Sequence, residues 1–452
     1  EPWTPIGSDV SNNYTGTFDG SRYTISGLYV DSDAQYVGLF GCVGTNGKIQ
    51  NVGVVDSYIS ATGDKVCVGG VCGYNYEGTI ENCYNTGTVT ATAQATGIYS
   101  SVGGVCGFSF WNIFNCYNTG KVSVTGDRAW VGGVSGFNGK DIKNCYNTGE
   151  VSVAVDGGVV GGVCGNNDSW SRITNCYNTG KVSVTGDNAV VGGVCGMNAN
   201  TIKNCYFLTG TADKGIGVGS SIFPNEATEK TENQFKSGEV AWLLNGNQNP
   251  QLWGQGSNDM PVLTSNLPKD VTYTVPVCVT IQMPDGTSEQ YGYTTKGNTL
   301  AEYPSQLNGK TYTFYEDSNF ATPIDTATKT YEKDTVIYAK EKKNSSGGGS
   351  VFFWDLKFDT NGGSKIDTVT EWEYSTIDLD EYVPEKEGYK FVGWYADEDL
   401  TKKIDEVYLT QDTTVYAKWE KIKEEVPEEP EETEEIKEPE TISFKDVKES
   451  DW

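Results

Sequence analysis

Histidine is absent from this 452-residue chain, and methionine occurs only three times. Without imidazole, the chain lacks the usual acid–base group of neutral pH and the histidine ligands of most zinc sites, so zinc peptidase motifs of the H-E-x-x-H type are excluded. Lysine and arginine total 33 against 61 aspartates and glutamates, which leaves a net charge of -28. Because nucleic acids and anionic membrane surfaces are bound through clustered cations, neither is an expected partner.

Long apolar stretches are also missing. No run of eighteen or more apolar residues occurs, so we expect no membrane insertion. The chain opens with Glu1, Pro2 and Trp3 rather than with Met or an apolar signal, so we expect that a signal segment has been removed or lies upstream. The last residues, 442–452, look like the beginning of a further domain, and we expect the parent protein to be longer.

Glycine, by contrast, is abundant, with 55 residues, and much of it lies in an internal repeat. One phrase occurs five times: V-G-G-V-C-G (with serine for cysteine in the third copy), a polar loop, and then I-x-N-C-Y. The first half starts at Val68, Val102, Val131, Val160 and Val191, and the second half at Ile80, Ile113, Ile142, Ile173 and Ile202. A diverged copy, Val37–Gly41 with Ile49–Val52, precedes them.

Each copy contains three short apolar runs, for example Val131–Gly136, Ile142–Tyr146 and Val151–Val155. Runs of this length, rich in β-branched residues and separated by Gly, Asn and Asp, are typical of strands, and helical spacing is missing. One set of strands per repeat predicts one turn of a parallel β-helix per repeat, with equivalent side chains stacked about 4.8 Å apart. The expected fold is therefore all-β: a parallel β-helix (solenoid) of about six coils.

The repeats resemble the GLUG repeat of bacterial surface proteins, and Gly38–Gly41 reads G-L-F-G. Two flanking stretches, Tyr14–Leu28 and Ser237–Leu263, resemble the segments that open and close such repeats. The resemblance covers residues 1–265 and implies a secreted, cell-surface protein.

Cysteine recurs at two equivalent positions of the repeat. One column contains Cys72, Cys106, Cys164 and Cys195, with Phe40 and Ser135 as substitutes; the other contains Cys83, Cys116, Cys145, Cys176 and Cys205, with Val52 as a substitute. A disulfide within each coil is one interpretation, because secreted proteins commonly contain them. The substitutes favour the other interpretation, a core ladder of reduced thiols. Paired C-x-x-C spacing is missing, so we expect no metal.

After the solenoid, residues 271–342 and 351–420 share a skeleton of alternating strands, which predicts two small β-grasp-like modules. The second contains Phe358–Gly363, a hairpin turn signal, and resembles the Listeria–Bacteroides repeat of internalin-type surface proteins. The first has Pro284–Gly286 in place of that turn and is a diverged copy.

Residues 343–350 are rich in Gly and Ser and predict a flexible linker, and residues 421–440 are rich in Glu and Pro and predict an extended acidic spacer. Residues 441–452 resemble the start of an S-layer homology domain. That resemblance implies anchoring to a cell-wall polymer through residues beyond Trp452.

These features predict a non-catalytic, wall-anchored adhesin or display stalk without cofactor. If each cysteine faces the core, the next residue faces outward, and we therefore expect an exposed stripe beside Asn85, Asn118, Asn147 and Asn178 that suits a host glycan or protein. The stripe consists of Tyr84, Tyr117, Tyr146, Tyr177 and Tyr206. The structural alternative is that the Tyr rings only shield the strands and the Asn side chains satisfy the hydrogen bonds of the turns.

Two other functions stay open. One is a carbohydrate-active β-helix enzyme, a lyase or a glycosidase, and the other is a purely structural component of the cell envelope. Asp127, Asp156 and Asp187 recur at the ends of strands, but beside Gly they indicate turns, so no residue is assigned a catalytic role.

Overall fold

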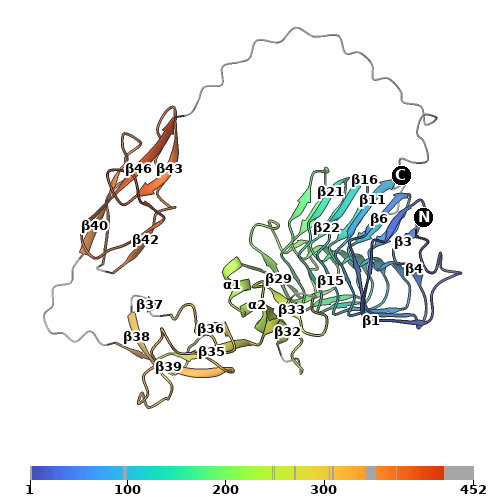
Figure 1. Cartoon of the computed structure of the whole chain (residues 1–452), viewed down its shortest axis with the longest axis horizontal. Helices are drawn as coiled ribbons and strands as arrows, with labels where there is room; N and C mark the ends of the chain where they lie inside the picture. The colour runs from blue at the N-terminus through green and yellow to red at the C-terminus, as the bar shows by residue number, and fades with distance from the viewer. Residues whose placement is uncertain are drawn as a thin grey trace, which may run out of the picture. The chain divides into compact units, whose positions relative to one another are not determined.

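The structure is a computed structural model (Figure 1) and describes residues 3–94, 99–246, 248, 250–268, 271–304, 306–307, 310–342, 353–372 and 374–421. The chain forms two compact units, Glu1–Lys343 and Asn344–Trp452. The predicted linker 343–350, all but the first residue of the spacer 421–440, and the stretch 441–452 lie outside the described residues.

A parallel β-solenoid of about six coils dominates the first unit, as predicted (Figure 1). Its strands form four sheets along the stack. The first sheet contains β2 (Tyr29–Ser32), β6 (Tyr58–Gly63), β11 (Thr88–Gln94), β16 (Val122–Asp127), β21 (Val151–Asp156) and β26 (Val182–Val184). The second contains β3 (Tyr36–Val37), β7 (Cys67–Gly69), β12 (Ser100–Gly103), β17 (Ala129–Gly132), β22 (Val159–Gly161) and β27 (Val190–Gly192).

The third sheet contains β4 (Phe40–Val43), β8 (Cys72–Asn75), β13 (Cys106–Ser109), β18 (Ser135–Asn138), β23 (Cys164–Asn167), β28 (Cys195–Asn198) and β30 (Ile216–Val218). The fourth has long strands at its ends: β1 (Thr17–Ser26), β5 (Lys48–Val55), β29 (Thr201–Leu208) and β31 (Asn225–Lys230). Between them, each coil adds two short strands: β9 (Thr79–Glu81) with β10 (Tyr84–Asn85), β14 (Ile113–Phe114) with β15 (Tyr117–Asn118), β19 (Asp141–Lys143) with β20 (Tyr146–Asn147), and β24 (Arg172–Thr174) with β25 (Tyr177–Asn178).

The three runs expected in each coil become five short strands, because the chain bends inside two of the runs. The run Val131–Gly136 is divided between β17 and β18. A Cβ atom on Gly133 would lie 2.2 Å from the carbonyl oxygen of Gly162 in the next coil, so this corner admits only glycine. The second run is broken at Asn144, whose φ of +53° is left-handed, a conformation that asparagine tolerates. Its equivalents, Asn82, Asn115, Asn175 and Asn204, have the same conformation.

Valine, isoleucine and cysteine side chains fill the interior of the coils. At the N-terminal end the opening segment covers this core, and the ring of Phe40 contacts the rings of Tyr14 (5.0 Å between centroids) and Phe18 (5.4 Å). Phenylalanine therefore replaces cysteine where the core must also contact the opening segment.

At the C-terminal end the chain leaves the stack and turns back along its side. This closing segment, residues 231–266, contains α1 (Glu232–Lys236), α2 (Glu239–Asn245), β32 (Trp253–Gly256) and β33 (Pro261–Leu263), which lie beside β29 and β15 (Figure 1). β34 (Tyr273–Thr274) pairs with β32. In the part of the chain that the structure describes, no helix has the length and apolar character needed to cross a membrane.

Two small β-grasp-like modules follow. The first contains β35 (Pro276–Gln282), β36 (Glu289–Thr295), β37 (Gln306–Leu307), β38 (Lys310–Tyr315) and β39 (Thr335–Glu341). The second contains β40 (Phe353–Asp359), β41 (Val369–Trp372), β43 (Tyr389–Tyr395), β44 (Lys403–Ile404) and β46 (Thr413–Lys421), with a separate pair, β42 (Thr376–Asp378) and β45 (Glu406–Tyr408). Both sheets have the same pairing: β35 is parallel to β39, as β40 is to β46.

Candidate functional site

The tyrosine column that we predicted to be an exposed stripe is buried. Its side chains do point away from the coil core, and the rings of Tyr84, Tyr117, Tyr146 and Tyr177 stack in order with centroids 4.7, 4.7 and 5.0 Å apart. The exposed fractions of Tyr117, Tyr146, Tyr177 and Tyr206, however, are 1, 3, 0 and 7 %. The prediction of an exposed stripe is therefore wrong, although Tyr84 is only half-buried.

The closing segment is the cause. Phe235, Val240, Leu244, Trp253 and Leu263 form one apolar cluster with the tyrosine rings. The indole of Trp253 lies 6.0 Å from the ring of Tyr146 and 5.7 Å from that of Tyr177, measured between centroids. The apolar residues of the closing segment were the sequence signal for this burial, because they must pack against another apolar surface of the protein.

The neighbouring asparagine column is also buried, and it satisfies turns. Asn118 donates from Nδ2 to the carbonyl oxygen of Gly120 (2.7 Å) and to Oδ1 of Asn147 in the next coil (2.8 Å). Asn147 repeats the pattern toward Gly149 and Asn178. The asparagines therefore form an internal hydrogen-bonded ladder.

Both cysteine columns are ladders of buried, free thiols. In the longer column the backbone N–H of Cys116 donates to Sγ of Cys145 (3.4 Å), and the thiol of Cys116 donates to the carbonyl oxygen of Phe114 (3.1 Å). The strand breaks at the left-handed asparagine, and the sulfur accepts the backbone N–H that this break leaves unpaired. A valine side chain has no atom that could accept it. Burial raises the pKa of the thiols of Cys72, Cys116, Cys164 and Cys176. Among the described residues, no group of three or more Cys, Asp or Glu could hold a metal ion.

Asp127 and Asp156 are the last residues of β16 and β21, Asp187 lies in a turn, and all three are exposed. The backbone N–H of Asp187 donates to Oδ1 of Asp156 (2.8 Å). These carboxylates stack at one turn of successive coils rather than facing each other across a cleft.

A partly exposed aromatic cluster covers a different face, formed by the second and third sheets of coils one to four. We call it the aromatic surface; it consists of Tyr36, Tyr74, Tyr76, Tyr99, Phe108, Phe110, Trp130 and Phe137. Phe108 occupies its centre, with ring centroids 5.4 Å from Tyr74 and 4.1 Å from Phe137. Sequence reasoning missed this surface, although aromatic residues two and four positions after the first cysteine (C-G-Y-N-Y and C-G-F-S-F) were a visible signal.

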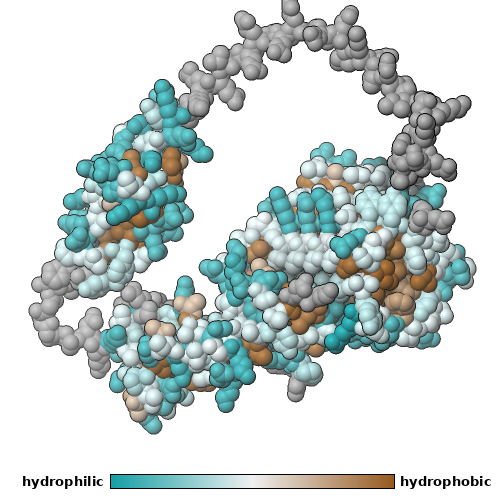
Figure 2. Space-filling model, in the orientation of Figure 1, coloured by the Kyte–Doolittle hydropathy of each residue, from teal (hydrophilic) through white to brown (hydrophobic). Residues whose placement is uncertain are grey.

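Two of these rings are open to solvent, and Phe137 is buried. Tyr76 is 42 % exposed and Phe110 is 40 % exposed. The surface ends where Asn166 takes the outward position in the fifth coil. Hydrophobic residues are also gathered near the N-terminal coils in Figure 2, and hydrophilic side chains recur in a regular row along another edge of the solenoid.

Two family descriptions match parts of the chain. "The GLUG motif" matches residues 65–90 and 156–185, and the Listeria-Bacteroides repeat domain matches residues 354–418. The solenoid therefore contains GLUG motifs, and the second unit contains a Listeria-Bacteroides repeat.

The curated relatives are similar over short segments. A "Putative Gly-rich membrane protein" of Evansella cellulosilytica is 40 % identical over 81 residues, which are 18 % of this chain and 9 % of that protein. A "Putative membrane protein" of the same organism is 32 % identical over 126 residues, 27 % of this chain and 18 % of that protein. "Halomucin" of Haloquadratum walsbyi is 40 % identical over 79 residues, 17 % of this chain and 1 % of that protein. The chain thus spans less than a fifth of the length of each relative.

A solved structure, that of a "putative immunoglobulin A1 protease" from Bacteroides ovatus, aligns with a TM-score of 0.45 at 22 % identity. The alignment covers 58 % of this chain and 81 % of that one.

Proposed function

We propose that this chain is a non-catalytic adhesion and display part of a secreted, surface-associated protein, and that its aromatic surface holds a glycan or a protein. The observation that carries the proposal is the exposure of Tyr76 and Phe110 on a continuous set of rings. Large aromatic groups that stay in water on a folded protein lower its solubility unless a partner covers them, and they dominate the energetics of most interfaces.

The side-chain ladders in the rest of the solenoid support the proposal that it is a scaffold. Its thiol and asparagine ladders are hydrogen-bonded internally, and the closing segment covers the tyrosine rings, so all three ladders serve packing rather than chemistry. The three turn aspartates lie apart from any described cleft. A repeated, rigid surface suits partners that are themselves repetitive, because weak contacts multiply along it.

The names of the relatives support a location at the cell surface. Two are named as membrane proteins, and these names agree with what the GLUG and Listeria-Bacteroides resemblances imply. The resemblance of residues 441–452 to the start of an S-layer homology domain supports anchoring to a cell-wall polymer.

The test is binding of the full chain to arrays of glycans and of extracellular proteins, with the double variant Tyr76→Ser/Phe110→Ser beside it. We expect the variant to lose at least about tenfold in affinity for the partner that the array identifies. The matched control is Tyr29→Ser/Tyr58→Ser, a stacked and exposed ring pair on the first sheet. Equal loss in both variants, or no partner on either array, would contradict the proposal.

A further inference from the structure

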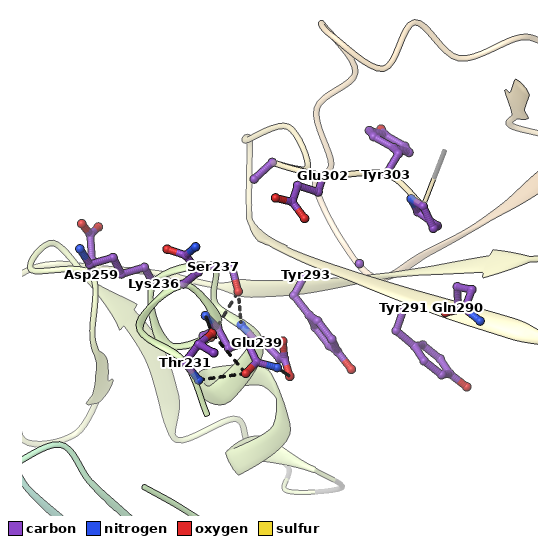
Figure 3. Close-up of a pocket in the computed structure, with 15 residues that line it drawn as sticks. Thr231, Lys236, Ser237, Glu239, Asp259, Gln290, Tyr291, Tyr293, Glu302 and Tyr303 are labelled. Atoms are coloured by element: carbon purple, nitrogen blue, oxygen red, sulfur yellow. Dashed lines mark hydrogen bonds between the residues drawn. The ribbon is translucent and has the colours of Figure 1, made fainter. Parts of the chain in front are cut away.

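A cleft of about 840 Å³ lies between the closing segment and the first small module, within the unit Glu1–Lys343. One wall comes from α1, the start of α2 and the turn at Asp259, and the other from β36 and the loop 301–304. Figure 3 shows Tyr291 and Tyr293 extending from the same side of β36, with Tyr293 nearer to the closing helices and with Glu302 and Tyr303 on the loop above.

The two walls are held together by contacts behind the cleft. The indole N–H of Trp242 on α2 donates to Oδ2 of Asp334 (3.1 Å), and Oδ1 of Asp334 accepts the backbone N–H of Cys278 (2.9 Å). The ring of Trp242 also contacts that of Tyr293, with centroids 5.6 Å apart. In the second module, Asp412 accepts the equivalent backbone N–H, from Asp355 (3.0 Å). The Asp334 carboxylate therefore has a second role in the first module, which is to join it to the closing segment.

The lower edge of the cleft is also preformed. Thr231 and Gln234 form a capping box at the start of α1, with reciprocal bonds of 3.3 and 3.0 Å. The Gln234 amide donates to Glu239 (3.1 Å), and Lys230 forms an ion pair with the same carboxylate at 2.5 Å. A site whose walls are fixed before binding loses less entropy when a ligand enters.

The cleft has the composition of a site for a polyol. The ring of Tyr291 is 55 % exposed and is available for stacking, whereas the ring of Tyr293 packs against Trp242 and is only partly exposed. Amide groups of Asn233 and Gln290 can donate to hydroxyl groups and accept from them, and the carboxylate of Glu302 accepts. Together these residues provide one apolar face and several hydrogen-bonding groups within one cleft, as a sugar ring requires.

The charged side chains of the cleft determine which class of ligand can bind there. Three carboxylates line the cleft, those of Glu239, Asp259 and Glu302. Lys236, the cation that lines it, is already paired with Glu232 at 2.8 Å. An anionic ligand would meet repulsion here. A basic peptide would gain little, because Asp259 and Glu302 are exposed and ion pairs in water contribute at most about 1 kcal/mol.

We propose that this cleft binds a neutral oligosaccharide, stacked on the exposed ring of Tyr291. The site is separate from the aromatic surface and does not depend on it. An adhesin with both sites would hold a glycan next to the first module independently of the partner on the solenoid.

The experiment is calorimetric titration of the full chain with neutral cello-, xylo-, manno- and chito-oligosaccharides, and with an oligolysine peptide. We expect one neutral series to bind and Tyr291→Ala to weaken it at least about tenfold, whereas Tyr23→Ala, an exposed tyrosine on β1, leaves it unchanged. Tyr76→Ser/Phe110→Ser should leave it unchanged as well, which separates this inference from the proposed function. Glu302→Gln should weaken the sugar by less than about threefold, since an amide still accepts.

Three results would overturn the inference: no neutral oligosaccharide binds, Tyr291→Ala binds as the native chain does, or the oligolysine peptide binds and Glu302→Gln abolishes that binding. Tyr291 is exposed, so its replacement is compatible with folding, and an unchanged melting temperature verifies this.

Discussion

Tyr177 donates its hydroxyl group to the carbonyl oxygen of Pro261 at 2.6 Å, across 84 residues of sequence. The bond joins the fifth coil of the solenoid to the closing segment, and both residues lie in or beside the apolar cluster around Trp253. The closing segment therefore contributes to the stability of the solenoid. The tyrosine column serves as its docking face rather than as a site for an outside ligand.

Replacement of Trp253 by alanine should destabilise the solenoid strongly. The indole is 1 % exposed and contacts two tyrosine rings, so its removal leaves a cavity and should lower the free energy of unfolding by about 3–5 kcal/mol. Urea denaturation measures the loss, and binding of a hydrophobic dye reports whether the tyrosine column becomes accessible.

The matched control is Trp170→Ala. Trp170 is 83 % exposed, so the change should stay within about 0.5 kcal/mol. If both variants unfold at the same urea concentration, the closing segment does not cover the column.

Much of the fold followed from the repeat, because coil stacking needs only strand-length apolar runs at a fixed period. The position of Cys116 toward the core and of Tyr117 away from it followed from the alternation of side chains along a strand. The fate of Tyr117 did not follow, since burial of an outward residue depends on a segment more than one hundred positions later in the sequence. Likewise, Phe108 and Phe137 are neighbours because β13 and β18 pair in register. The loops of successive coils differ in length, so this pairing could not be read from a fixed spacing in the sequence.

Asparagine at the strand break has two functions that can be separated at Asn144. It holds a left-handed φ of +53°, and its side chain links Asn115 to Asn175 through bonds of 3.1 and 3.2 Å. Asn144→Gly keeps the backbone conformation and loses the ladder, whereas Asn144→Ala loses both. We expect the alanine variant to be less stable than the glycine variant by about 1 kcal/mol, measured by urea denaturation.

The critical result is which of these two variants has the higher free energy of unfolding. If alanine is as stable as glycine or more stable, the conformation at Asn144 is not left-handed in the folded protein. If the glycine variant matches the native chain, the side-chain ladder contributes nothing.

Stability should fall at alkaline pH. Burial raises the pKa of the thiols of Cys116 and Cys176 and of the phenols of Tyr146 and Tyr177 in the folded chain. A raised folded pKa gives stability that is complete below the unfolded pKa and is lost as pH rises above it. The loss should therefore begin above about pH 8.5, where unfolded cysteine ionises, and steepen above about pH 10, where unfolded tyrosine does.

Each thiol that ionises only in the unfolded chain lowers the free energy of unfolding by about 1.4 kcal/mol per pH unit. Urea midpoints measured from pH 7 to 10.5 test this slope. A flat profile across pH 8–10 would show that the buried cysteines do not titrate on unfolding, which oxidation to disulfides would explain.

The state of the thiols can be counted directly. The chain contains twelve cysteines, all buried and all free in the structure, so the chain unfolded without reductant should react with about twelve equivalents of a thiol reagent, and the folded chain with almost none. Sγ of Cys145 accepts the N–H of Cys116 in the preceding coil and donates to the carbonyl oxygen of Lys143 (3.3 Å), and a disulfide at Cys145 would remove the second of these bonds. Two to four equivalents after unfolding would instead identify disulfides within the coils. The variant Cys145→Val provides the internal check: it keeps the side-chain volume but loses the acceptor for Cys116, and it should cost about 1–3 kcal/mol if the ladder is reduced.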